Sequence, residues 1–124
     1  MPPEFVIIEQ GSEAGHFVIA ARGEIDLFTA PELKQVITDA IESGERRMAI
    51  DLTEVSFLDS TALGVLIGAV KRLRSRGGAL AVVNTDSSIA KTFQITGLDQ
   101  IFTIVPSRAE ALEALDDEIE GSAA

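Results

Sequence analysis

A carboxylate and two hydroxyls stand side by side in the run Asp59-Ser60-Thr61. Residues of these types are favoured at a helix start, because their side-chain oxygens accept the free backbone N–H groups of the first turn. One cap needs only one such residue, so a hydroxyl is left for other chemistry. The positive end of a helix dipole also tolerates a phosphate group. Ser60 is therefore a candidate phosphoacceptor with Thr61 as the alternative, and a helix cap with no further role is the competing interpretation.

Composition narrows the classes of protein to consider. The 124 residues carry 20 acidic and 10 basic side chains, a net charge of −10, and 46% are hydrophobic. The hydrophobic content excludes wholesale disorder, and the negative charge argues against direct binding to nucleic acid. The chain has no cysteine, which excludes disulfides and zinc–thiolate sites. The first residues lack a signal-peptide pattern. The longest apolar run, 62–70, is too short to cross a bilayer. We therefore expect a cytoplasmic protein without a membrane span.

Residues able to catalyse a reaction are scarce. A serine hydrolase needs a positioned histidine as its base. The only histidine of the chain is His16, and we predict that it is a surface or edge residue at the start of a strand. The glycines that precede Lys71 do not have the spacing of a phosphate-binding loop. Asp51, Glu54 and Asp59 are candidate metal ligands by residue type only. We interpret Asp51 as a structural carboxylate at the end of a strand. The sequence therefore predicts no enzyme, no metal and no cofactor.

Hydrophobic patterning predicts one α/β domain over residues 1–115. Apolar stretches predict strands, and capping residues followed by helical periodicity predict helices, the first of them capped by Thr29. The order is two strands in a hairpin, followed by alternating helices and strands. Such an order favours a mixed sheet flanked by about four helices. The expected strands are 5–8, 16–21, 48–52, 79–83 and 101–104; the expected helices begin after residues 29, 59, 86 and 107, and the acidic tail 116–124 is expected to be disordered.

The predicted topology brings acidic groups to one edge of the sheet. Glu24 and Asp26 follow the second strand, and Asp59 with Thr61 follows the third. Functional groups gather beyond the carboxyl ends of parallel strands. We therefore expect Glu24 and Asp26 to lie near Ser60 and to form part of a surface that binds a partner.

The second helix is apolar on every side between residues 62 and 70. Its helical spacing places Leu63, Leu66, Ile67 and Val70 on one buried face, and Ala62, Val65 and Ala69 towards the other side. We expect Ala62 and Val65 to extend the partner surface from Asp59 and Thr61 along this helix.

Three segments together resemble one known family: Gly23-Glu24-Ile25-Asp26, Asp51-Leu52-Thr53 and the run from Phe57 to Gly64. They are similar to the STAS domain family and, within it, to stand-alone bacterial anti-sigma factor antagonists. The similarity extends from about Phe5 to Leu115, and it implies the STAS-like mixed sheet. Many relatives have glycine at the position of Ala62.

The resemblance also implies a mechanism. The unphosphorylated protein binds an anti-sigma factor that is also a serine kinase, and this releases a sigma factor. Phosphorylation of Ser60 ends the binding, and a serine phosphatase restores it. The alternative function is a non-switching STAS interaction or scaffold module of a larger assembly or transport system.

Overall fold

The chain begins with a tight β-hairpin. The computed structural model describes residues 5–123, and the side chains of residues 5–118. Strands β1 (Val6–Glu13) and β2 (His16–Ile25) pair antiparallel around Ala14 and Gly15. Both turn residues have positive φ, 53° and 84°, as a two-residue hairpin turn of the favoured hand requires. The sequence predicted that the first strand ends at residue 8, but pairing with β2 extends β1 through polar residues to Glu13.

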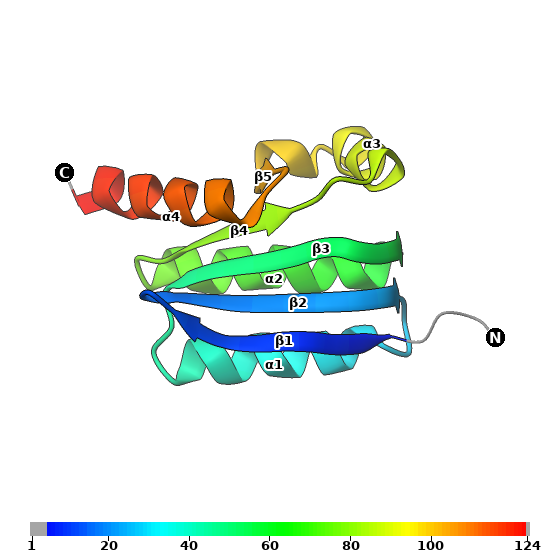
Figure 1. The fold of residues 1–124 in the computed structure, drawn as a ribbon, viewed down its shortest axis with the longest axis horizontal. Coiled ribbons are helices and arrows are strands. Elements are labelled where there is room, and N and C mark those ends of the chain that lie inside the picture. Colours follow the sequence, from blue (N-terminus) through cyan, green and yellow to red (C-terminus); the bar gives the residue numbers. More distant parts are fainter. Residues whose placement is uncertain (1–4, 124) are drawn as a thin grey trace.

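Alternating helices and strands follow the hairpin. In chain order they are α1 (Ala30–Glu42), β3 (Arg47–Leu58), α2 (Ser60–Ser75), β4 (Ala79–Val83), α3 (Ser87–Thr96), the 3₁₀ turn Leu98–Gln100, β5 (Thr103–Val105) and α4 (Arg108–Ala123). The five strands form one sheet in the order β1-β2-β3-β4-β5, and every pair after the hairpin is parallel (Figure 1). The predicted mixed sheet with about four helices is confirmed.

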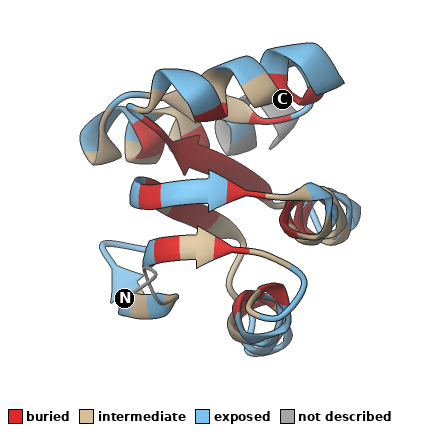
Figure 2. Cartoon of the chain, turned by 90° about the vertical axis from the view of Figure 1, so that its right-hand side faces the viewer, coloured by how far each residue is buried: buried red, intermediate tan, exposed pale blue. Residues whose placement is uncertain are grey.

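Each face of the sheet has its own apolar core. Ile19, Ile50 and Val82 point to the face covered by α1 and α2, where they meet buried residues such as Leu33 and Leu66. The alternate positions Val18, Ala49 and Ala81 meet Ala111 and Leu115 of α4 on the opposite face. Figure 2 shows α1 and α2 end-on along one side of the strands, with their buried residues turned towards the sheet. The two-residue alternation of the strands produces both cores.

Helix α4 differs from the sequence prediction, which ended it near Leu115. The helix continues to Ala123, and Ala124 lies outside the described residues. Asp116 Oδ1 lies 2.9 Å from His16 Nε2 and 3.3 Å from Arg47 Nε. These contacts attach the helix to the beginnings of β2 and β3. His16 is buried and belongs to β2, which lies between two other strands, so its interpretation as a surface or edge residue is wrong.

Strands β2 and β3 run side by side to their carboxyl ends. Ile25 pairs with Leu58, and the backbone N–H of Asp59 donates to the carbonyl oxygen of Ile25 at 3.2 Å. The loop after β2 and the start of α2 are therefore joined at the same edge of the sheet, the right-hand edge in Figure 1. This edge carries the residues that the sequence singled out.

Candidate functional site

The start of α2 is capped by one residue of the Asp-Ser-Thr run. Asp59 has extended backbone geometry, and its Oδ1 accepts a hydrogen bond from the backbone N–H of Ala62 at 3.0 Å. Ser60 is the first helical residue and is exposed. Within the described residues the Ser60 and Thr61 side chains make no hydrogen bond. The cap therefore uses the carboxylate and leaves the exposed Ser60 hydroxyl available.

The loop between β2 and α1 is held by Asp26. Its Oδ1 accepts from the backbone N–H groups of Phe28 at 2.9 Å and Thr29 at 3.1 Å. The Thr29 hydroxyl donates to the Glu24 carbonyl oxygen at 2.9 Å and accepts from the Asp26 backbone N–H. Thr29 occupies the N-cap position of α1, as the sequence predicted, but its side chain makes no capping hydrogen bond to the helix. The Asp26 carboxylate holds the loop before the helix, and backbone carbonyl oxygens take the first helical donors: that of Asp26 accepts from the Ala30 N–H at 2.8 Å and that of Thr29 from the Glu32 N–H at 3.1 Å.

This loop presents apolar side chains that the sequence analysis missed. Leu27 is 61% exposed and Phe28 is 86% exposed at its tip. Phe57, near the end of the adjacent strand β3, is 48% exposed. Exposed large apolar side chains at the carboxyl ends of two neighbouring strands make this edge a candidate interaction site. The signal in the sequence is a Leu-Phe pair inside a turn, where a purely structural loop has no need of either residue.

The remaining predicted residues lie on two different sides of α2. Val65 is partly buried, whereas Ala62 and Ala69 are 0% exposed. Ala62, Leu66, Ala69 and Leu73 recur at helical spacing and form the stripe that faces the sheet. The prediction that Ala62 contributes a side chain to a partner surface is therefore wrong, because alanine is small enough to fill the closest approach of the helix to the sheet. Thr61 and Val65 lie on the flank facing α1.

Asp51 lies away from this edge and is part of a structural network. Its Oδ1 accepts from the Thr53 hydroxyl at 2.8 Å and from the Thr53 backbone N–H at 3.0 Å. Its Oδ2 accepts from Arg108 Nη2 at 3.0 Å, and Arg108 also binds Glu9 at 2.8 Å. Partial burial raises the pKa of Asp51, but the hydrogen bonds from Thr53 and Arg108 outweigh it and hold that pKa below its ordinary value of 3.8.

Among residues 5–118, whose side chains the structure describes, no three His, Cys, Asp or Glu side chains are grouped as a metal site would need. No helix within residues 5–123 has both the length and the apolar character needed to cross a bilayer.

Comparisons with known proteins fit this geometry. Residues 8–111 match the model of the STAS domain family. A curated relative, the anti-sigma-B factor antagonist of Listeria monocytogenes, is 40% identical over 92 residues, which are 74% of this chain and 81% of that protein. The crystal structure of an anti-sigma factor antagonist from Mycobacterium paratuberculosis has a TM-score of 0.85 and 30% identity, and covers 94% of this chain and 97% of that one.

The fold is also similar to that of the Bacillus cell fate determinant SpoIIAA in its phosphorylated form. That structure has a TM-score of 0.63 at 22% identity, and the match covers 90% of this chain and 97% of that one. The family match spans most of the chain, including both loops at the carboxyl edge of the sheet. This chain is a member of the STAS domain family.

Proposed function

We propose that this protein is an anti-sigma factor antagonist, that it binds an anti-sigma factor with serine kinase activity, and that phosphorylation of Ser60 switches this binding off. The observation that carries the proposal is the Ser60 hydroxyl, exposed at the first position of α2 while Asp59 alone caps the helix. The names of the relatives in Listeria and Mycobacterium support the partner class.

The surroundings of Ser60 suit a contact that forms and breaks. Leu27, Phe28 and Phe57 offer exposed apolar area at the same edge of the sheet. Glu24 near the end of β2 and Asp26 in the loop after it add negative charge beside β3. Thr61 and Val65 continue the surface along α2. Aromatic anchors of this kind carry much of the energy of small interfaces. The proposed partner surface thus consists of Glu24, Asp26, Leu27, Phe28, Phe57, Asp59, Ser60, Thr61 and Val65.

A phosphate on Ser60 would act on the interface and not on the fold. It adds nearly two negative charges at a helix N-terminus, a position where the helix dipole favours them. The same charges would enter a contact surface beside Asp59, and burying them without a partner is costly. We infer that the modified protein stays folded, that it dissociates from the kinase, and that a serine phosphatase regenerates the binding form.

The experiment is phosphorylation by a purified anti-sigma factor kinase with ATP, followed by mass-spectrometric mapping and binding titration. The Ser60→Ala variant should lose the label and keep its thermal midpoint, because Asp59 still caps α2. Ser60→Asp should bind the kinase about tenfold more weakly or worse, a change of about 1.4 kcal/mol. Ser87→Ala is the matched control and should still be labelled, because Ser87 is the exposed first residue of α3 behind its own aspartate cap, Asp86. Labelling of Ser60→Ala at a distant residue would contradict the proposal, as would Ser60→Asp binding as tightly as the parent.

A further inference from the structure

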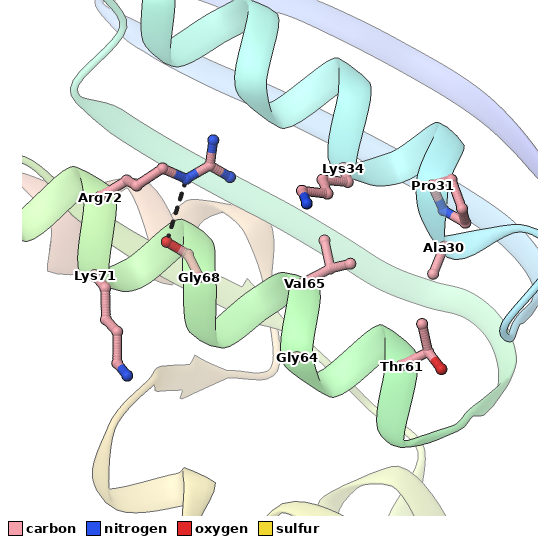
Figure 3. Close-up of a pocket in the computed structure, with 9 residues that line it drawn as sticks. All are labelled: Ala30, Pro31, Lys34, Thr61, Gly64, Val65, Gly68, Lys71 and Arg72. Carbon is pink, nitrogen blue, oxygen red and sulfur yellow. Dashed lines mark hydrogen bonds between the residues drawn. The ribbon is translucent and has the colours of Figure 1, made fainter.

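A groove lies between α1 and α2, next to the candidate phosphorylation site. Its volume is about 710 Å³, within the range of sites that hold a ligand or a segment of a partner. Thr61 lines the end nearest Ser60, and Gly64 and Gly68 of α2 line its length. Figure 3 shows Lys34 extending from α1 towards α2 and Arg72 extending from α2 towards α1, with Lys71 on the outer side of α2.

The charged residues that line the groove are all cations, although the chain has a net charge of −10. Within the described residues, Lys34 and Lys71 form no ion pair. Arg72 is held by neutral acceptors: its Nη1 donates to Thr38 Oγ1 at 2.9 Å and its Nε to the Gly68 carbonyl oxygen at 3.4 Å. The positive charge of the groove is therefore not compensated by a carboxylate among these residues. The complementary ligand is one that carries carboxylates.

The groove also contains space that the fold itself does not use. Gly64 and Gly68 lie inside α2, where glycine favours helix less than alanine does. A Cβ atom built on either residue meets no atom within 4 Å. No other part of the chain that the structure describes comes so close to Gly64 or Gly68 that only glycine would fit there. They keep the groove deep enough for side chains from another molecule.

We propose that this groove binds an acidic segment of the anti-sigma factor, with small apolar side chains over Gly64 and Gly68 and carboxylates paired with Lys34, Lys71 and Arg72. This inference rests on the proposed function, because the groove continues from Thr61 into the surface around Ser60. The Ser60 end of that surface carries Glu24, Asp26 and Asp59, so the two ends have opposite charge. A partner with basic groups at one end and acidic groups at the other fits in one orientation only.

The charge test uses the purified kinase that phosphorylates this chain at Ser60. Lys34→Glu combined with Lys71→Glu should weaken binding by about tenfold or more, mainly through slower association, and should reduce the salt dependence of affinity. Lys91→Glu is the matched control, because Lys91 is the third lysine of the chain, is exposed on α3 and does not line the groove. The affinity of the Lys91→Glu variant for the kinase should stay within about twofold of that of the parent.

The space test uses Gly68→Leu. Leucine is a better helix former than glycine, so the thermal midpoint should stay the same or rise. Its side chain would fill the groove, so affinity for the kinase should fall by about tenfold or more. Loss of affinity in a variant that is at least as stable as the parent cannot come from misfolding. If this variant and the lysine double variant both bind like the parent, the groove is not part of the interface.

The proposed function and the groove inference fail in different ways. A parent chain that neither binds such a kinase nor becomes phosphorylated at Ser60 overturns both. A parent chain that does bind and is phosphorylated, with all groove variants unchanged, overturns only the groove inference. Amide NMR shifts in the complex give an independent readout: changes at Ala30, Lys34, Gly64 and Gly68 support the groove, and changes confined to residues 24–28 and 57–61 contradict it.

Discussion

At the scale of single residues, Asp26 combines two properties that substitutions can separate. Its carboxylate accepts two backbone N–H groups and so holds the loop that carries Leu27 and Phe28. Its negative charge also belongs to the proposed partner surface. Asparagine keeps an acceptor oxygen and removes the charge, whereas alanine removes both.

We predict that Asp26→Asn keeps the thermal midpoint within about 2 °C of the parent and lowers affinity for the anti-sigma kinase, because only charge is lost. Asp26→Ala should also destabilise the fold, by about 1 kcal/mol, because the free N–H groups lose their acceptor. Thermal melts and binding titrations on both variants make the comparison. An Asp26→Asn variant with unchanged affinity would remove this carboxylate from the interface.

At the scale of secondary-structure elements, α2 belongs both to the core and to the surface. Leu66 is 0% exposed and points to the sheet, whereas Val65 is partly exposed on the flank beside α1. The two side chains are neighbours in the sequence and similar in type. Only their position around the helix differs, so they form a matched pair for mutation.

We predict that Leu66→Asp loses more than about 4 kcal/mol of stability and unfolds much of the protein, because an unpaired charge enters the core. Val65→Asp should stay folded and bind the kinase more weakly, because its carboxylate reaches solvent at the mouth of the groove. Circular dichroism melts report the first effect and titrations the second. Equal destabilisation by both variants would mean that α2 is entirely core and that the partner surface lies in the loops.

At the scale of the whole molecule, one carboxylate links elements far apart in the sequence. Asp51 of β3 binds Arg108 at the start of α4, and Arg108 binds Glu9 of β1. The Asp51 side chain is only 12% exposed, so solvent screens this contact less than a surface ion pair. The network fixes α4 on its face of the sheet.

The depressed pKa of Asp51 gives this network a pH dependence. A group whose pKa is lower in the folded protein stabilises the fold above its unfolded pKa, which for Asp51 is the ordinary value of 3.8. That contribution disappears as the pH falls through the folded value. We predict that Asp51→Asn costs about 1.5–3 kcal/mol at pH 7, the range for a hydrogen bond to a charged group.

Thermal melts of the parent and of Asp51→Asn at a series of pH values give the difference in their free energies of unfolding. This difference should disappear as the pH falls below about 4. Glu54→Gln is the control: Glu54 pairs with Arg22 at 3.3 Å with both side chains about half exposed, so its loss should shift stability by less than about 1 kcal/mol. A gap between the parent and Asp51→Asn that persists unchanged at pH 3 would show that the Asp51 charge is not its source.

Local sequence determined the order of elements and the position of the candidate site. Strand β4 and the start of α2 lie where apolar runs and capping residues predict them, because those signals act over a few neighbouring residues. The Asp-Ser-Thr run identified Ser60 as a surplus hydroxyl, and the structure assigns the cap to Asp59. Parallel-sheet topology was enough to bring Glu24 and Asp26 to the same edge as Ser60.

Tertiary packing decided what local signals leave open. Whether Ala62 faces the sheet or a partner depends on the rotation of α2, which all-round apolar character does not specify. Helix α4 continues past Leu115, where Asp116 contacts His16 and Arg47, which lie 100 and 69 residues earlier in the chain. The groove between α1 and α2, the uncompensated charge of Lys34 and the exposure of Phe28 likewise exist only once distant segments are brought together, because burial is a property of the folded chain and not of any one segment.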